Sequence, residues 1–259
     1  TLEEYGKNEL VGLLIAGVYD QYKDQWRENL SLPNPFYFKS FFEGKEMTVL
    51  AENPLKHETR LDFDKATWER ESEFSSLLLR STRFVSHQDD SILAEKIQIK
   101  AKKKGRYSFT YGLNSDIYEI HGPHYKSKEI VIDGDTVIFK GISNEGKNLF
   151  ITSKYSGFAG NLDNLTNLFH FEKEMEEGEE TSVSIISRVD EDAPSPLPYA
   201  SFESLKEESV VAFEKKRQSS LIEIEGDEEL DFELAYSINH VLILGDERRV
   251  RSIAARGLS

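Results

Sequence analysis

The feature that most constrains the fold of this chain is a long stretch, from about residue 68 to residue 189, in which apolar and polar residues alternate. Because successive side chains of a β-strand point to opposite faces of a sheet, this period of two indicates strands with one buried face. The clearest runs cover residues 77–85, 92–99, 107–111, 130–132, 137–139, 149–151 and 183–186. The sequence therefore predicts a mainly β protein.

Short turns join these expected strands. Asp133-Gly134-Asp135 and Asn144-Glu145-Gly146-Lys147 each contain a glycine, which adopts the positive φ of a tight hairpin at no steric cost. No helical pattern of about 10 to 15 residues lies between the strands, so antiparallel pairing is favoured over parallel pairing. We expect antiparallel sheets packed face to face, that is, a two-layer sandwich.

The pattern changes near Asp190. Three prolines fall between residues 194 and 198, and because proline neither extends a central strand nor continues a helix, they predict a semi-rigid connector. Ser204, with Glu207 three residues later, has the form of a capping box and predicts the start of a helix. A second helical pattern covers residues 228–244 and is apolar on more than one side, which indicates burial against several neighbours.

Composition narrows the choice of partners and compartment. Thirty-two basic residues against 47 acidic ones give a formal charge of −15, which disfavours nucleic acid and anionic membranes as partners. The apolar run at 10–19 is too short for a membrane span, and no basic segment precedes it as in a signal peptide. The chain has no cysteine, which excludes disulfides and fits a reducing compartment. We therefore expect a cytoplasmic protein.

Five short segments occur in a defined order: Ile-Ala-Gly-Val-Tyr-Asp at 15–20, Leu-Pro-Asn at 32–34, Arg-Leu-Asp at 60–62, Arg-Phe-Val-Ser at 83–86 with the acidic pair at 89–90, and Ala-Ala-Arg-Gly-Leu-Ser at 254–259. In this order and spacing they resemble the N-terminal part of glycoside hydrolase family 65, the maltose, kojibiose and trehalose phosphorylases. Pro35, Phe213 and Leu221 depart from the residues often found in the family at the matching positions. The last segment looks like the one that leads into Phe-Trp-Asp-Thr-Glu, the first signature of the family's catalytic barrel, which is not in this sequence.

The resemblance implies a fold and a division of the chain. Residues 1–190 would form a super-β-sandwich of the galactose mutarotase-like type, and residues 191–226 a helical linker. Residues 227–259 would be the first helix and trailing loop of an (α/α)6 barrel that is cut off before its chemistry begins. In the family, the general acid and the phosphate ligands belong to that barrel. We therefore expect no catalytic residue, metal ligand or cofactor in this chain, and no activity from it alone.

For the parent protein, the resemblance implies an inverting phosphorylase that converts an α-linked glucose disaccharide and phosphate to β-glucose 1-phosphate and glucose, with maltose as the first expectation. Kojibiose, nigerose and trehalose follow. The expected partners are the chain's own C-terminal barrel, the disaccharide, phosphate and a second copy in a homodimer. The alternative is a free-standing carbohydrate-binding or mutarotase-like sandwich, for which the apolar helical pattern at 228–244 has no evident use.

His121 and His124 stand three residues apart around Gly122-Pro123, with acidic residues at 116 and 119 nearby. A zinc site would need further ligands of defined spacing, and an acid–base pair would need a carboxylate that the sequence does not locate. A structural turn, a loop that contacts the barrel and a catalytic pair are the three interpretations, and the resemblance favours the first. In the full-length protein, the residues expected to face the barrel or the substrate are His121, His124, Arg256 and Ser259.

Other conspicuous groups predict structural roles. Arg60, Arg80 and Arg83 are expected in ion pairs on a sheet face. The basic run at 100–106 and the acidic run at 172–180 are expected to be solvated turns between strands. Packing is favoured over a sugar platform for the aromatic cluster at 35–42.

Overall fold

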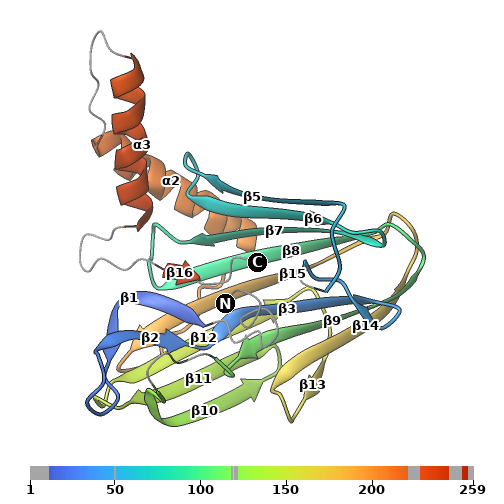
Figure 1. The fold of residues 1–259 in the computed structure, drawn as a ribbon, viewed down its shortest axis with the longest axis horizontal. Helices are drawn as coiled ribbons and strands as arrows, with labels where there is room; N and C mark the ends of the chain where they lie inside the picture. The colour runs from blue at the N-terminus through green and yellow to red at the C-terminus, as the bar shows by residue number, and fades with distance from the viewer. Residues whose placement is uncertain are drawn as a thin grey trace.

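The computed structural model describes residues 12–49, 51–117, 119, 122–220, 228–244 and 253–255 (Figure 1). In chain order the strands are β1 (Leu13–Asp20), β2 (Glu28–Leu32), β3 (Asn34–Phe42), β4 (Lys45–Glu46), β5 (Lys56–Asp62), β6 (Thr67–Glu73), β7 (Leu77–Val85), β8 (Ile92–Ala101), β9 (Gly105–Asn114), β10 (Tyr125–Asp133), β11 (Thr136–Ser143), β12 (Asn148–Ser156), β13 (Asn161–Asp163), β14 (Leu168–Met175), β15 (Glu180–Glu191) and β16 (Ile253–Ala255). Two helices, α2 (Phe202–Ser220) and α3 (Glu228–Leu244), lie between β15 and β16.

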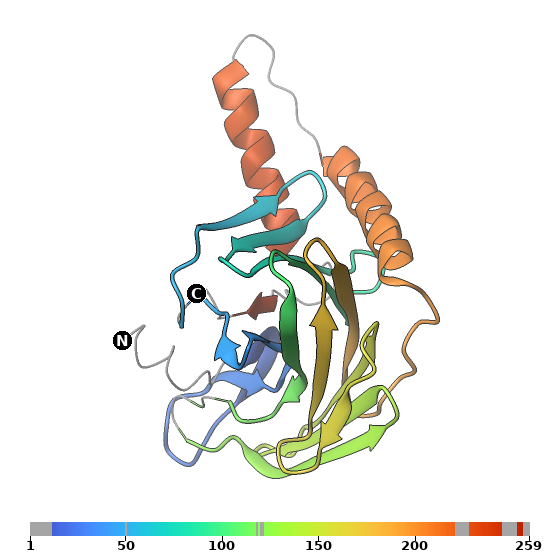
Figure 2. The ribbon, with the colours of Figure 1, turned by 90° about the vertical axis from the view of Figure 1, so that its right-hand side faces the viewer.

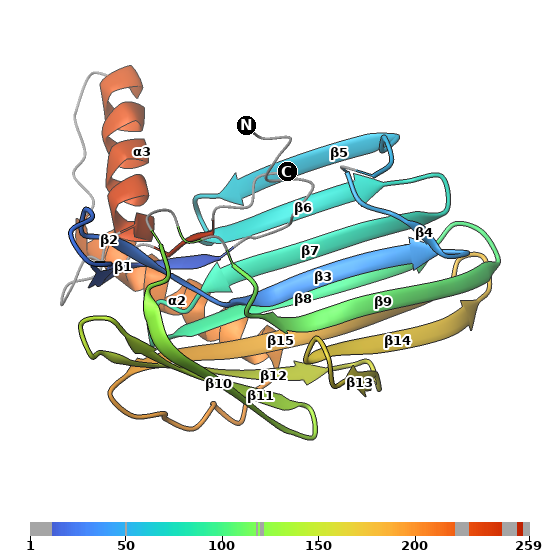
Figure 3. The ribbon, with the colours of Figure 1, turned by 60° about the horizontal axis from the view of Figure 1, so that its bottom comes forward.

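The strands form two main layers. An eight-stranded sheet has the order β10-β11-β12-β15-β8-β7-β6-β5, and a five-stranded sheet has the order β13-β14-β9-β3-β4. The smaller sheet lies over the middle of the larger one, as Figures 2 and 3 show. A third sheet, β16-β1-β2, lies at one end of the sandwich, and all pairs in the three sheets are antiparallel. The prediction of a mainly β, two-layer antiparallel sandwich is confirmed.

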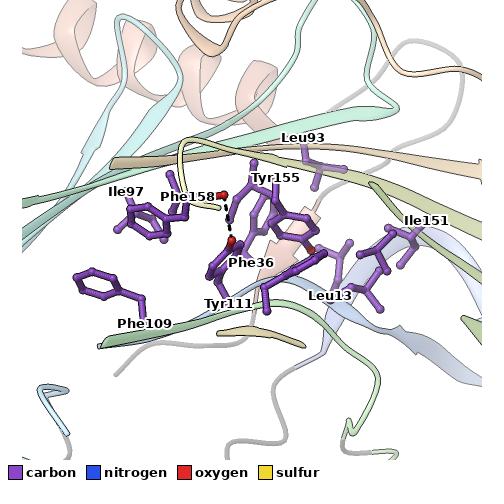
Figure 4. Close-up of a cluster of buried hydrophobic side chains, with 14 of the residues drawn as sticks. Leu13, Phe36, Leu93, Ile97, Phe109, Tyr111, Ile151, Tyr155 and Phe158 are labelled. Atoms are coloured by element: carbon purple, nitrogen blue, oxygen red, sulfur yellow. Dashed lines mark hydrogen bonds between the residues drawn. The ribbon is translucent and has the colours of Figure 1, made fainter. Parts of the chain in front are cut away.

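The core lies between the two main sheets and is rich in aromatic rings (Figure 4). Phe109 of β9 stacks on Phe38 of β3, with ring centroids 5.8 Å apart. The buried hydroxyl of Tyr155 donates to the carbonyl of Pro35 at 2.9 Å, so its polar end is satisfied inside the core. Phe36, Phe38 and Phe42 therefore pack in the core, as predicted, whereas Tyr37 and Phe41, which alternate with them along β3, are not part of the core cluster.

The turns follow the sequence pattern. Gly134 and Gly146 adopt φ angles of +59° and +86° at the β10–β11 and β11–β12 turns. The middle of the basic run, residues 102–104, forms the turn from β8 to β9, and residues 176–179 of the acidic run form the turn from β14 to β15. The ends of both runs, which were also expected in turns, lie in the strands. On the large sheet Arg80 pairs with Glu71 at 2.7 Å across β7 and β6, whereas Arg60 pairs with Asp62 of its own strand at 3.2 Å.

Helix α2 covers part of the outer face of the large sheet. Phe202 and Leu205 pack against a cluster that includes Phe84 and Ile186. The helix begins before the predicted capping box: Ser201 is the cap, because its hydroxyl accepts the Ser204 N–H at 3.2 Å. The assignment of Ser204 as the cap was wrong. Phe202 is buried against the sheet, so the helix begins two residues before Ser204, which lies in its first turn. Helix α3 has the predicted bounds and extends away from the sandwich beside α2 (Figures 1 and 2).

Strand β16 is the unexpected element. Its three residues pair with residues 13–15 of β1, although the sequence predicted only a trailing loop in this region. An edge strand presents unpaired N–H and C=O groups, and β16 satisfies those of β1. The division into domains at residues 190 and 226 stays a prediction. Within the ranges given above, neither helix has the length and apolar character needed to cross a membrane.

Candidate functional site

His124 is the predicted site residue that the structure places most firmly. It directly precedes β10, and its side chain is only 1% exposed. Its Nδ1 lies 3.2 Å from Oδ2 of Asp20, and its Nε2 lies 2.6 Å from Oε1 of Glu28. Asp20 ends β1 and Glu28 begins β2, and the two are register partners across that hairpin. The imidazole therefore joins two carboxylates that the hairpin holds opposite each other.

Asp20 is the centre of this cluster. Its side chain is completely buried, and it accepts the backbone N–H groups of Glu145 at 2.9 Å and Asn144 at 3.3 Å. Burial alone would raise the pKa of the Asp20 carboxyl, but hydrogen bonds from Glu145, Ser143, His124 and Asn144 outweigh it and hold the pKa below its usual value of 3.8. The buried carboxylate thus ties the β1–β2 hairpin to the β11–β12 turn.

The loop before β10 is fixed by the same neighbours. Glu119 accepts the backbone N–H of His124 at 2.8 Å, and Asn144 donates its side-chain amide to the carbonyl of Pro123 at 2.8 Å. Gly122 has a φ of +115°, and a Cβ there would lie 2.4 Å from the ring of Tyr22. A larger residue at 122 would force the loop away from the hairpin.

This arrangement has the chemistry of a structural link. Both ring nitrogens of His124 face carboxylate oxygens at the protein's interior, so neither is directed toward a substrate. In the part of the chain that the structure describes, no three His, Asp or Glu side chains converge as a metal site. Because each ring nitrogen contacts a different carboxylate of the hairpin, the imidazole is suited to holding the hairpin and the loop before β10 together.

The other predicted site residues have different outcomes. His121, Arg256 and Ser259 lie outside the described residues. Of the two nearby acids, Glu119 joins the cluster, whereas the backbone N–H of Asp116 bonds to Oδ1 of Asn114. The sequence pattern does not reveal the two carboxylates that flank the ring, because they are 104 and 96 residues away along the chain. Asp20 closes one of the quoted segments, but nothing in the sequence marks Glu28.

The fold and this closed cluster define a class: an antiparallel β-sandwich followed by helices, with its buried acid and base groups engaged in holding the sandwich together. The glycosyl hydrolase family 65 N-terminal domain matches residues 1–183. The chain belongs to glycoside hydrolase family 65, as the sequence resemblance predicted.

Two similar proteins extend this finding. A nigerose phosphorylase of Lachnoclostridium phytofermentans is 24% identical over 310 aligned residues, which cover 100% of this chain and 40% of that protein. A solved structure described as a candidate kojibiose phosphorylase from human microbiome has a TM-score of 0.54 at 10% identity, covering 92% of this chain and 31% of the other. The second likeness shows the fold alone. The chain thus spans about 40% of the length of the curated relative.

Proposed function

We propose that this chain is the non-catalytic N-terminal domain of an inverting α-glucoside phosphorylase, which converts a disaccharide and phosphate to β-glucose 1-phosphate and glucose. The observation that carries this proposal is the family match over residues 1–183. The chain also aligns with a phosphorylase and covers 40% of the length of that protein. The closed cluster around His124 supports it, because a buried imidazole held at both nitrogens is a poor general acid or base. The chemistry would then belong to a catalytic barrel outside this chain.

The substrate class is an α-linked glucose disaccharide. Maltose is the expectation from sequence, and the two similar proteins are described as acting on nigerose and kojibiose. Because these disaccharides differ only in the linkage between two glucose units, the contacts that choose among them would lie at the catalytic centre. Within the proposal, this domain shapes the entrance to that centre and supports a homodimer in the cytoplasm.

The helices provide a surface for the barrel. Phe232 of α3 is 67% exposed, whereas Tyr236 packs its ring on Phe63 of the β5–β6 turn at 4.9 Å. Full burial of such an aromatic ring against another surface would be favourable by about 1.5 to 3 kcal/mol. We assign this face of α3 to the neighbouring helices of the parent protein's own barrel.

The test compares this chain with the complete protein that its gene encodes. Each is incubated with phosphate and with maltose, nigerose, kojibiose or trehalose, and glucose 1-phosphate is measured, with phosphate-free reactions as controls. The complete protein should release it from at least one disaccharide, and this chain from none. Release by this chain, abolished by His124→Ala, would place the chemistry in the sandwich. Disaccharide binding by this chain, with no phosphorolysis by the complete protein, would favour a carbohydrate-binding module instead.

A further inference from the structure

One end of the large sheet extends beyond the small sheet. β5 and β6 form this end, and in Figures 2 and 3 they lie past the strands of the smaller layer. Leu79 of β7 belongs to the core and therefore faces inward. Because every second residue of a strand shares a face, Ser81 and Arg83 also face inward, and we call these inward-facing side chains and their neighbours on β6 the inward row. Their register partners on β6 are Arg70 and Trp68.

The inward row carries more positive than negative charge. Arg83 donates from Nη2 and Nε to one carboxylate oxygen of Glu95, at 2.8 and 3.2 Å. Arg70 has no acceptor among the residues that the structure describes: its Nε is buried without a hydrogen-bond partner, as is the hydroxyl of its register partner Ser81. Two guanidinium groups therefore face one carboxylate, and a guanidinium does not lose its proton in a protein.

His57 of β5 adds no further positive charge to the inward row. Its Nδ1 lies 2.9 Å from the hydroxyl of Ser72, and burial, followed by the charge of Arg70, lowers the pKa of His57 below 6.5. The imidazole is neutral at neutral pH. Among the described residues of the inward row, an excess of one positive charge thus remains, contributed by Arg70.

The Arg70 side chain is held in place before any ligand arrives. Its guanidinium carbon lies 5.9 Å from the centre of the Trp68 ring, and that of Arg83 lies 5.4 Å from the same ring and 4.7 Å from Phe36. In such contacts the flat face of the guanidinium group lies against the aromatic ring. Its N–H groups point outward in the plane of the group and can still donate to an acceptor. Arg70 as a residue is half-buried, whereas its Nε is enclosed.

We propose that Arg70, with Arg83 and the hydroxyl of Ser81 beside it, binds a small oxyanion of the phosphate type on the inner face of the β5–β7 overhang. Phosphate suits the site because its charge offsets the unmatched guanidinium and its oxygens accept the paired N–H groups of arginine. The site is distinct from the His124 cluster, and it does not depend on the proposed function.

Trp68 provides the first readout. The chain has two tryptophans, and the other, Trp26, is 79% exposed, so Trp26→Phe leaves Trp68 as the single tryptophan of a folded protein. Inorganic phosphate added at constant ionic strength should change Trp68 fluorescence in a saturable way. Arg70→Gln in this background should weaken binding by about tenfold or more, because it removes charged hydrogen bonds. Arg80→Gln is the matched control, since Arg80 lies on the opposite face of β7 and pairs with Glu71.

His57 provides the second readout, by NMR. The charge of Arg70 contributes to the lowered pKa of His57, so a bound anion that offsets this charge should raise that pKa. Arg70→Gln should raise it without phosphate and remove the response to phosphate. A merely structural Arg70 would give no phosphate-dependent change.

The remaining arms decide the outcome. Sulfate should reproduce the effect of phosphate, and acetate should bind more weakly. Acetate binding as tightly as phosphate would overturn the assignment to a phosphate-type anion, and the absence of any saturable change would overturn the site. An equal loss in Arg80→Gln would also overturn it. Circular dichroism checks the fold of each variant. If Arg70→Gln does not fold, Arg70→Lys, which keeps the charge but loses the paired N–H edge, takes its place with the same expected direction.

Discussion

A carboxylate without any contact to solvent is costly unless several donors surround it, and Asp20 has four. Two are backbone N–H groups of the β11–β12 turn, one is the Ser143 hydroxyl and one is the His124 ring. The charge on Asp20 therefore stabilises contacts between segments more than 100 residues apart, since Asn144 lies 124 positions along the chain. At this scale one ionised side chain joins the β1–β2 hairpin to the β11–β12 turn.

Asp20→Asn should lower the free energy of unfolding by on the order of 2 kcal/mol at neutral pH, because the amide keeps one oxygen and places an NH2 group against donors. The folded pKa of Asp20 is lowered from 3.8, so its stabilisation is complete above that value and is lost as the pH falls through the lower folded pKa. Urea unfolding of both proteins as a function of pH measures this difference. The gap should narrow in acid, and Asp133→Asn, at an exposed turn, should show no such gap. A constant gap would contradict the assignment.

The sequence revealed only part of this cluster. The loop around Pro123 and the acid at 119 could be placed together because they are close in sequence. Asp20 and Glu28 could not, since their position beside His124 depends on how the β1–β2 hairpin packs against the end of the sandwich, which no local pattern specifies. For Arg70, the sequence shows a basic residue in a strand, and only strand register shows that it lacks an acceptor.

Among the elements, α2 contacts the large sheet through a small apolar cluster, through hydrogen bonds of Ser209 with Val85 and His87, and through a ring contact of Phe213. Phe213 is completely buried, and its ring lies 4.7 Å from that of His87, in the loop after β7. Burial, and then the charge of Lys216 on α2, lowers the pKa of His87 to about 4. The contact is therefore made by a neutral imidazole at neutral pH and is opposed by its protonation.

His87→Phe should remove part of the acid sensitivity of the protein. His87 has a folded pKa of about 4 and an unfolded value near 6.5, so its contribution is present above pH 6.5 and declines as the pH falls from 6.5 to 4. Over this window, the wild-type free energy of unfolding should fall by on the order of 2 kcal/mol more than that of His87→Phe. Denaturant unfolding at both ends of the window tests this. His170→Gln, at an exposed histidine of β14, is the control, and parallel profiles for wild type and His87→Phe would rule out this role.

Strands with one buried face could be predicted from the sequence. Strands that are mostly exposed or very short could not. β7 has the bounds predicted from its pattern because inward and outward residues alternate along most of its length. β5 has only Asp62 buried, so its charged sequence carries no period-two signal. β16 is too short for any pattern, and its existence depends on the unpaired edge of β1.

At the scale of the whole molecule, the sandwich and α3 depend on each other very little. The core cluster between the two sheets is drawn entirely from residues 13–189, and the contacts of α3 include those with α2 and the ring contact of Tyr236 with Phe63. Among the C-terminal residues that the structure describes, 253–255 return to the sandwich as the three backbone pairs of β16 with β1. We therefore expect the stability of the sandwich to depend little on α3, and the exposed Phe232 of α3 to favour association with other chains.

Removal of residues 228–259 should leave the thermal unfolding of the sandwich nearly unchanged and reduce concentration-dependent self-association. The sandwich keeps its core, and the loss of three edge pairs with β1 is small beside it. Association falls because a large exposed apolar side chain, Phe232, is lost with the helix. Calorimetry and analytical ultracentrifugation measure the two effects.

Two full-length variants separate the causes: Phe232→Lys should lower association without changing the transition, and Ile253→Pro should disturb only the β16 pairing. If the truncated chain instead loses its cooperative transition while Ile253→Pro retains it, α3 belongs to the sandwich's folding unit, and the predicted boundary between sandwich and helices is misplaced.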